Sequence, residues 1–336
     1  MPELHTEVWP PAHDITELIG HTPLIELGRL APDAPEVLVK HEGFNPGGSI
    51  RDRTVLEILD NAFASGLLRR GDEVVIAGAT NSAVAACVIG QARGCSVTVF
   101  HRAGGPRRLL ELLSRAGANL IQTSTAGLDG TVLEAANYAR DSHDRIFIDA
   151  GRREALQDAM RHIAREIIEA LEGRHVGAFV TSFSTGSTLR IVSKELRVQY
   201  PELTVVGVKI ATPESRDGFY DDVAPSLVLD AATRAGADAQ RLVMTESEAW
   251  RARALIARTE GLLLGPKGAA AALTALRLRP HIPADRAIVA LSIDGGHRYF
   301  GAEPTEVHGA LAAVATIQDR PSALAAMREL IEEGTP

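Results

Sequence analysis

The segment NPGGSIRDR, residues 45–53, contains the first side chain whose chemistry can be judged from its type alone. Arg51 carries a delocalised guanidinium that stays protonated, so it has no free amine to attack a carbonyl carbon. It can hold a carboxylate or phosphate through forked hydrogen bonds, or form a structural ion pair with an acidic neighbour. The Asn-Pro-Gly-Gly sequence is typical of a turn, and Ser49 with Asp52 three residues later predicts a capping box at a helix start.

Three polar residues, Thr80, Asn81 and Ser82, follow the apolar run EVVIAG. The pattern predicts that they lie where a buried strand gives way to a helix. The N-terminus of a helix favours an anion, because its first N–H groups are unpaired and the helix dipole is positive there. The same residue types are also ordinary helix caps, so ligand contact and simple capping both remain open.

A second hydroxyl-rich segment, SFSTGSTLR, follows an apolar run at residues 182–190. Backbone N–H groups, hydroxyl donors and a helix N-terminus together make a cradle for a phosphate group. A plain Ser/Thr-capped helix is the alternative. The residues that would form the cradle are Ser184, Thr185, Gly186, Ser187 and Thr188.

Lysine is rare in this chain, with only four lysines among 35 basic residues. Lys267, in EGLLLGPKGAAA, is the one that the motifs place near a site. A desolvated lysine can form an imine or act as a general base. The ordinary alternative is a solvated lysine at a helix start, since lysines are usually exposed. His297, in SIDGGHRYF, is a further catalytic candidate beside Arg51 and Lys267.

Apolar runs of strand length alternate with amphipathic runs of helix length along most of the chain. Strands are expected at 36–43, 73–78 and 96–100, for example, with a helix from Ser49 to about Ala64. Such alternation predicts an α/β fold in which mostly parallel sheets carry helices on both faces.

Composition excludes several classes of function. The net charge of −8 argues against non-specific binding to nucleic acid or to an anionic membrane surface. Cys87 and Cys95 give neither a disulfide framework nor zinc spacing, and the histidines form no metal motif, so we expect no metal and a reducing cytoplasm. The first residues lack the basic and apolar regions of a signal peptide, and no apolar run is long enough to span a membrane.

Four motifs, LIGHTPL, FNPGGSIRDR, EGLLLG and HRYF, occur in the order and at roughly the spacing found in one enzyme family. From residue 14 to residue 300 the chain resembles the cysteine synthase and cystathionine β-synthase group, the type II fold of pyridoxal-phosphate enzymes. The resemblance implies a tryptophan synthase β-like fold, with two domains around a cofactor cleft, and a homodimer. The expected domains are a smaller one at 41–150, a larger one at 1–40 and 151–310, and a helical tail at 311–336.

The resemblance also implies roles for individual positions. In relatives a lysine at position 51 binds the cofactor through an imine, and Arg51 stands in its place here. Asn81 matches an asparagine that contacts the ring oxygen of the cofactor. Thr80 and Ser82 lie in the loop that binds the substrate carboxylate, although that loop's two glycines are replaced by Thr80 and Ala83.

Other matching positions are partly kept and partly changed. Residues 184–188 match the loop that binds the cofactor phosphate. Gly295 matches a serine that contacts the ring nitrogen in many relatives, and Asp294 is adjacent to it. Two segments that shape the substrate pocket in relatives have become FIDAGRREA (147–155) and TPESRDGFYDD (212–222).

These observations predict a cysteine synthase-like protein that lacks the cofactor-binding lysine. We expect a pseudoenzyme or ligand-binding homologue that retains the phosphate loop and binds a small phosphate- or carboxylate-bearing ligand. Pyridoxal phosphate is then either held without a link at position 51 or absent. The alternative is a divergent enzyme of amino-acid or specialised metabolism, with the cofactor held non-covalently or through Lys267.

Overall fold

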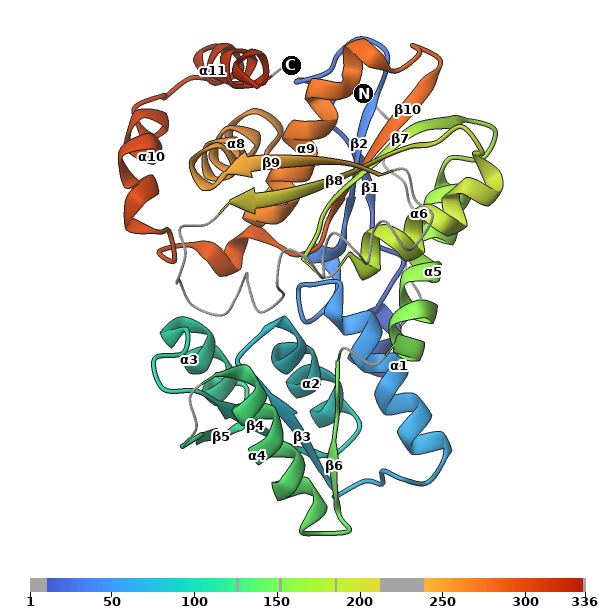
Figure 1. The fold of residues 1–336 in the computed structure, drawn as a ribbon, viewed down its shortest axis with the longest axis vertical. Helices are drawn as coiled ribbons and strands as arrows, with labels where there is room; N and C mark the ends of the chain where they lie inside the picture. The colour runs from blue at the N-terminus through green and yellow to red at the C-terminus, as the bar shows by residue number, and fades with distance from the viewer. Residues whose placement is uncertain (1–10, 125–126, 151–152, 185, 212–238, 335–336) are drawn as a thin grey trace.

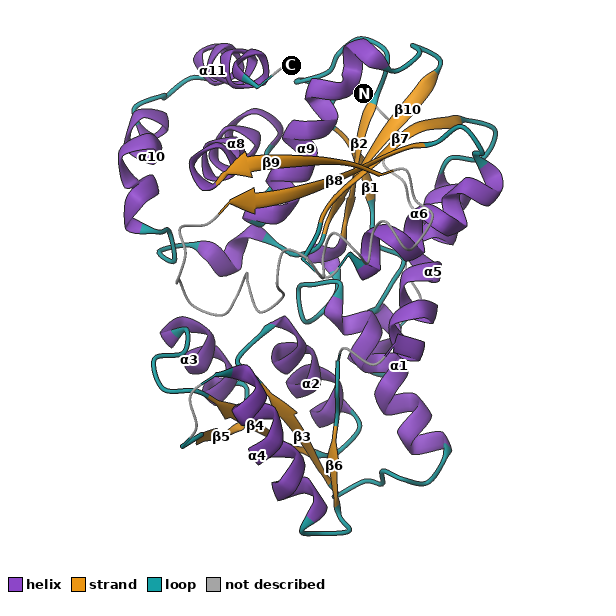
Figure 2. Cartoon of the chain, in the orientation of Figure 1, coloured by secondary structure: helices purple, strands orange, loops and turns teal. Residues whose placement is uncertain are grey.

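The computed structural model describes residues 11–124, 127–150, 153–184, 186–211 and 239–334. Its strands form two separate sheets, one of six strands and one of four, which lie in the upper and lower halves of Figure 1. Helices cover both sheets (Figure 2), so the predicted α/β fold class is confirmed. The predicted domain boundaries remain a prediction.

The six-stranded sheet is parallel except for its first pair of strands. Its order is β1-β2-β10-β7-β8-β9, and only β1 and β2 pair antiparallel. The central strands are buried almost throughout, as continuous apolar runs predict. The strand bounds are β1 Leu24–Glu26, β2 Val37–His41, β7 His175–Ser182, β8 Thr204–Ala211, β9 Ala239–Thr245 and β10 Arg286–Ser292.

Each face of this sheet has its own apolar core. One core holds side chains of α8 and α9 and is extended by α11; the other holds side chains of α5 and α6. Helix α10 also contacts α8. The helix bounds are α5 Arg153–Ala170, α6 Ser187–Gln199, α8 Glu246–Glu260, α9 Pro266–Leu278, α10 His308–Ala315 and α11 Arg320–Glu333.

The four-stranded sheet is wholly parallel, in the order β5-β4-β3-β6. Helices α1 and α2 bury their apolar side chains on one face, and α4 covers the other. The bounds are α1 Arg51–Ala64, β3 Glu73–Ala77, α2 Asn81–Ala92, β4 Ser96–His101, α3 Arg107–Arg115, β5 Asn119–Gln122, α4 Leu128–Arg140 and β6 Arg145–Phe147.

Two strands were not expected from the sequence. Strand β1 has only three residues, too few for a pattern. Strand β9, AQRLVMT, lies at an edge of the sheet and leaves Val243 mostly exposed, so it lacks the apolar run of a central strand.

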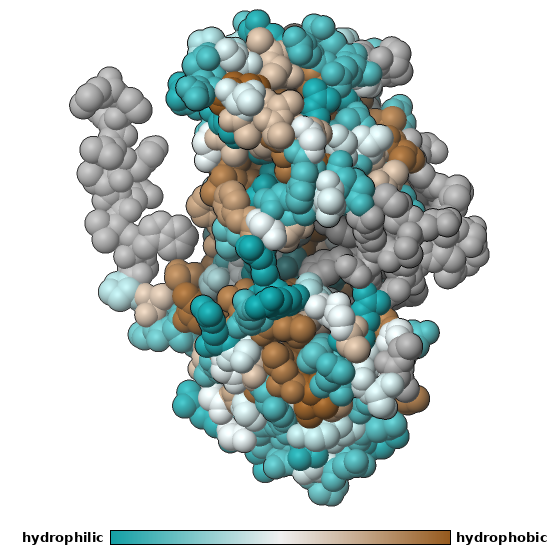
Figure 3. Space-filling view, turned by 90° about the vertical axis from the view of Figure 1, so that its left-hand side faces the viewer, coloured by the Kyte–Doolittle hydropathy of each residue, from teal (hydrophilic) through white to brown (hydrophobic). Residues whose placement is uncertain are grey.

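The outer surface is mixed in character. On the side that carries α3 and α10, hydrophilic and hydrophobic side chains alternate, with one compact hydrophobic patch on the lower half (Figure 3). No helix in the part of the chain that the structure describes is long and apolar enough to cross a membrane.

Candidate functional site

Helix α1 begins at Arg51, next to the end of strand β10. The predicted capping box does not form as a reciprocal pair: the assigned cap residue is Ile50, which is helical and makes no side-chain cap bond, and the Asp52 carboxylate does not bond back to Ser49. Ser49 Oγ accepts a hydrogen bond from the Arg51 N–H at 3.2 Å, whereas Asp52 Oδ2 accepts from the Gly47 N–H. The carboxylate of Asp52 therefore closes the turn before the helix.

The backbone just before α1 is hydrogen-bonded to the segment that follows β10. Ser49 forms an antiparallel bridge with Asp294, and the Ile50 N–H donates to the carbonyl of Ile293 at 2.8 Å. These bonds join the start of α1 to the segment that follows β10.

A buried charge network lies beneath this turn. Arg53 Nε donates to Glu42 Oε2 at 2.6 Å, and its Nη1 donates to Glu166 Oε1 at 2.6 Å. Lys40 Nζ donates to Glu166 Oε2 and to the carbonyl of Thr22, both at 2.5 Å. Two cations and two carboxylates thus neutralise one another and hold α1 against β2 and α5.

Sequence analysis did not identify this network. Lys40 is only 2% exposed although it lies within the apolar run VLVKH. A lysine in a buried strand requires an acidic partner, because an unpaired buried charge is very unfavourable. The sequence could therefore have predicted that Lys40 has an acidic partner, but it could not have predicted which residue that partner is. Burial opposes ionisation of Glu166, yet Arg53 and Lys40 outweigh it and lower the pKa of Glu166 to about 2.

Asn81, at the start of α2, is held by side chains that follow β10 of the six-stranded sheet. Its Nδ2 donates to Asp294 Oδ2 at 2.9 Å, and its Oδ1 accepts from Arg298 Nη1. Asp294 Oδ2 also accepts from the hydroxyl of Tyr299 at 2.6 Å. The amide of Asn81 is therefore engaged at both ends by residues that follow β10.

Asp52 lies close to this cluster and is fully buried. Burial raises its pKa to about 7, against the opposing effects of the Gly47 N–H and of the nearby Arg298 charge. Asp52 Oδ1 and Asp294 Oδ1 are both buried without a hydrogen-bond partner among the described residues.

Thr80 and Ser82, which flank Asn81 at the start of α2, do not act as simple helix caps. Thr80 is the cap residue, but its side chain makes no capping hydrogen bond, so the capping alternative fails for it. Ser82 is buried inside the first turn. Asn81, rather than either hydroxyl, makes the contacts across the cleft.

The hydroxyl-rich segment joins β7 to α6 as predicted. Gly186 is the cap residue of α6 with φ +77°, a left-handed conformation that glycine adopts without strain, and a Cβ there would meet nothing within 4 Å. Ser187 and Thr188 are half-buried in the first turn, and Ser184 is exposed. Thr185 lies outside the described residues.

Lys267 and His297 occupy different environments. Lys267 is half-buried in the first turn of α9, two residues after Gly265, whose missing Cβ would collide with Asp294 Oδ1. His297 is exposed in the short helix Gly296–Tyr299. Lys267 thus lies two residues from a glycine that packs against Asp294, and His297 lies three residues after Asp294 in the chain.

The two changed segments are only partly described. Arg51 Nη1 makes a long hydrogen bond of 3.5 Å to the carbonyl of Ala150, so this described residue of the segment 147–155 lies against the guanidinium. Burial lowers the pKa of Arg51. The segment 212–222 lies outside the described residues.

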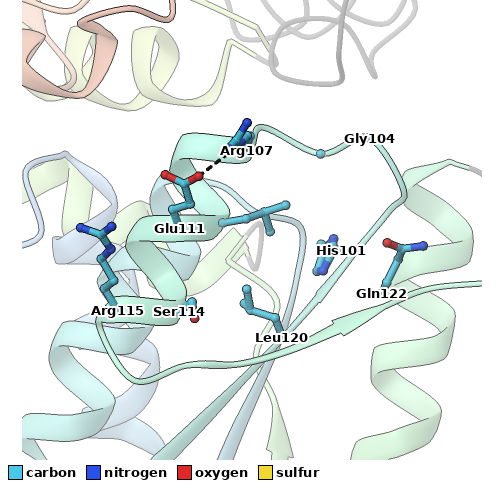
Figure 4. A pocket seen from close by; sticks show the side chains of 10 residues that line it. His101, Gly104, Arg107, Glu111, Ser114, Arg115, Leu120 and Gln122 are labelled. Atoms are coloured by element: carbon cyan, nitrogen blue, oxygen red, sulfur yellow. Dashed lines mark hydrogen bonds and ion pairs between the residues drawn. The ribbon is translucent and has the colours of Figure 1, made fainter.

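A separate hollow of about 410 Å³ lies on the four-stranded sheet between α3 and β5 (Figure 4). Arg107 and Glu111 on its rim form an ion pair at 2.9 Å, and both are exposed. None of the site residues identified from the sequence lines this hollow. Among the described residues there is also no group of His, Cys, Asp or Glu that could hold a metal.

The two mostly parallel sheets, the cluster of residues from α1, α2 and the end of β10, and the glycine-capped α6 are typical of the type II fold pyridoxal-phosphate proteins. The family model "Pyridoxal-phosphate dependent enzyme" matches residues 15–294, and the chain belongs to this family. An O-ureido-L-serine synthase of Streptomyces lavendulae is 30% identical over 310 residues, 86% of this chain and 91% of that protein. A probable cysteine synthase of Bacillus subtilis is 28% identical over 306 residues, 85% and 96% of the two chains.

Solved structures agree with this assignment. A crystal structure of O-ureido-L-serine synthase superimposes with a TM-score of 0.75 at 29% identity, covering 90% of this chain and all of that one. A lysine-to-alanine mutant of that enzyme, with O-ureido-L-serine bound, gives a TM-score of 0.74 at 29% identity, covering 92% and 100%. A cysteine synthase of Entamoeba histolytica shares the fold, with a TM-score of 0.75 at 22% identity over 99% and 98% of the chains.

The residues of this cleft do not fit a covalently held pyridoxal phosphate at the start of α1. The side chain there is a guanidinium, which cannot condense with an aldehyde. The amide of Asn81, the expected contact of the ring oxygen, is already bonded to Asp294 and Arg298.

Proposed function

We propose that this protein is a ligand-binding homologue of the cysteine synthases that does not carry out conventional β-replacement. The single observation that carries the proposal is Arg51, at the first position of α1 and against the carbonyl of Ala150. Catalysis through an imine needs an unprotonated amine at this point of the cleft, and a guanidinium does not supply one.

The proposed ligand is a small molecule with a phosphate or carboxylate group, bound by a cytoplasmic homodimer. Arg51 can form forked hydrogen bonds to such an anion, and the left-handed Gly186 precedes the N-terminus of α6, where the helix dipole favours negative charge. The lysine-to-alanine mutant of O-ureido-L-serine synthase, crystallised with O-ureido-L-serine, supports the view that this fold keeps a ligand site without that mutant's lysine.

The visible spectrum and chemical trapping test whether the protein lacks conventional β-replacement chemistry. The purified protein is mixed with pyridoxal phosphate, reduced with borohydride, and digested for mass spectrometry, with a cysteine synthase treated in parallel. We expect no labelled lysine and no turnover of O-acetylserine with sulfide. A labelled lysine, or turnover above background, contradicts the proposal.

A test of the phosphate loop compares two glycines with the same backbone strain. Gly186 and Gly66 have φ of +77° and +72°, and a Cβ meets nothing within 4 Å at either position. At constant ionic strength, Gly186→Ala should weaken binding of inorganic phosphate by about tenfold, the effect of about one hydrogen bond. Gly66→Ala should leave binding unchanged, and equal effects of the two variants contradict the assignment.

Lys267 supports a second candidate function, that of a divergent enzyme. It is half-buried in the first turn of α9, and Gly265, two residues earlier, packs against Asp294. A lysine in such a place can form an imine or act as a base. Borohydride trapping at Lys267, abolished by Lys267→Ala, would select this function over the first.

A further inference from the structure

Asp294 is fixed in the cleft by its backbone. It follows β10, forms the antiparallel bridge with Ser49, and its carbonyl accepts from the Gly265 N–H at 3.2 Å. The next residue, Gly295, donates its N–H to the carbonyl of Gly48 at 3.1 Å. The peptide is therefore held on both sides, by the turn before α1 and by the start of α9, and its side chain points towards α2.

The Asp294 side chain reaches Asn81, the first residue of α2. Asp294 is 1% exposed, and its Oδ2 accepts from Asn81 Nδ2 at 2.9 Å and from the Tyr299 hydroxyl at 2.6 Å. Gly265 has room for no side chain, because a Cβ there would overlap the Asp294 carboxylate. The short bond between Asp294 and Asn81 is thus part of a packed arrangement and not a chance surface contact.

This bond closes the space that a pyridine ring would need. If Asn81 contacted the ring oxygen and the segment at 294–295 contacted the ring nitrogen, two hydrogen bonds of about 2.9 Å and the ring itself would separate them. The two hydrogen bonds alone add up to about 6 Å, and the width of the ring increases the separation further. The observed distance between Asn81 Nδ2 and Asp294 Oδ2 is 2.9 Å.

We propose that Asp294 is a specificity-determining residue that captures Asn81 and excludes the pyridine ring of pyridoxal phosphate from the cleft. This inference rests on the proposed function and extends it, because it identifies a second obstacle to the cofactor that is independent of Arg51. Restoring the amine at position 51 is then insufficient, since the ring has no place beside Asn81 until Asp294 is shortened.

The experiment measures covalent labelling in four proteins: wild type, Arg51→Lys, Arg51→Lys with Asp294→Ser, and Arg51→Lys with Asp294→Asn. Each is incubated with pyridoxal phosphate and reduced with borohydride, and the modified peptide is quantified by mass spectrometry. Serine is too short to reach Asn81, whereas asparagine keeps an oxygen acceptor of the same reach and is the matched control.

We expect labelling at position 51 to be at least about tenfold higher with Asp294→Ser than with Arg51→Lys alone or with Asp294→Asn, since one buried hydrogen bond changes an equilibrium by about that factor. Equal labelling of the three variants overturns the proposal. The proposal is also overturned if the double variant, Arg51→Lys with Asp294→Ser, is not labelled although its circular dichroism and thermal melting show that it is folded.

If that double variant does not fold, Asp294→Ser alone carries the test. Its affinity for pyridoxal phosphate, from quenching of tryptophan fluorescence, should exceed that of the wild type by about tenfold, and unchanged affinity overturns the proposal. A label on Lys267 in the wild-type protein would instead refute the proposed function. The role of Asp294 would still be decided by the label at position 51.

Discussion

Arg53 and Glu166 face each other between α1 and α5 and share two parallel hydrogen bonds, 2.6 Å from Nη1 to Oε1 and 2.7 Å from Nη2 to Oε2. Because Arg53 belongs to the first turn of α1, this pair fixes the helix whose first residue is Arg51. The orientation of the cleft residue thus depends on an ion pair that does not itself face the cleft.

Glu166→Gln should destabilise the protein by about 3 kcal/mol, because it leaves Arg53 and Lys40 buried with one fewer negative charge. Chemical denaturation of the two proteins at neutral pH measures the difference. Its size should shrink as the pH falls from 4.5 towards 2, since the lowered pKa of Glu166, about 2, means that its stabilising charge is lost over that range.

The matched control is Glu111→Gln, which removes the exposed ion pair to Arg107. Exposed pairs contribute little because water screens them, so this variant should unfold like the wild type. A similar loss of stability in both variants would show that the buried network has no special role.

The free energy of unfolding of Asp52→Asn should increase relative to that of the wild type as the pH rises. Burial raises the folded-state pKa of Asp52 from 3.8 to about 7, so the wild type takes up a proton on folding and loses stability as the pH increases between those values. Asparagine does not titrate, so the gap between the two proteins should widen by up to about 4 kcal/mol from pH 4 to pH 7.

Denaturation curves at several pH values measure this gap. A constant offset between the two proteins would reflect only the changed hydrogen bond to the Gly47 N–H and would leave the titration of Asp52 unsupported.

His41 should make the protein sensitive to acid below pH 6.5. Burial lowers its pKa to about 4, so between these values the unfolded chain binds a proton that the folded chain does not. The free energy of unfolding should fall by up to about 3 kcal/mol as the pH drops from 6.5 to 4. His41→Asn keeps an acceptor near the Gly43 N–H and removes the titration, so its stability should depend less on pH. Parallel pH profiles of the two proteins would contradict the assignment.

Gly48→Ala should destabilise the protein more than Gly66→Ala. Both glycines have positive φ, +79° and +72°, so both variants carry the strain of a left-handed alanine, about 1 kcal/mol. At Gly48 the new Cβ would also lie 2.8 Å from Arg298 Nη2 and force that guanidinium away from Asn81. Thermal melting of the two variants gives the comparison, and equal shifts would show that Arg298 moves freely.

Much of the fold could be predicted because its signals are local. The buried strands β3, β4, β7 and β8 are continuous apolar runs, and the helices between them have one apolar face, so strand-helix alternation is visible without any contact. Strand β9 could not be predicted in this way, since an edge strand with an exposed side such as Val243 does not need an apolar run.

The site was predicted in part. The sequence identified Arg51, Asn81 and the glycine-capped start of α6, because residue type and neighbouring turn signals mark them. It predicted the wrong partner for Asp52, because the carboxylate accepts from the Gly47 N–H in the preceding turn, and that turn is held by a bridge between Ser49 and Asp294, more than two hundred positions apart in the chain.

Residue type by itself determined that Arg51 cannot form an imine, because the basicity and delocalisation of a guanidinium do not depend on the fold. Only the tertiary structure decided which buried charges pair and which cleft groups are occupied. Lys40 meets Glu166 across 126 positions of sequence, and Asn81 meets Asp294 across 213. Such contacts arise from the packing of distant elements, and no local pattern specifies the distance between their atoms.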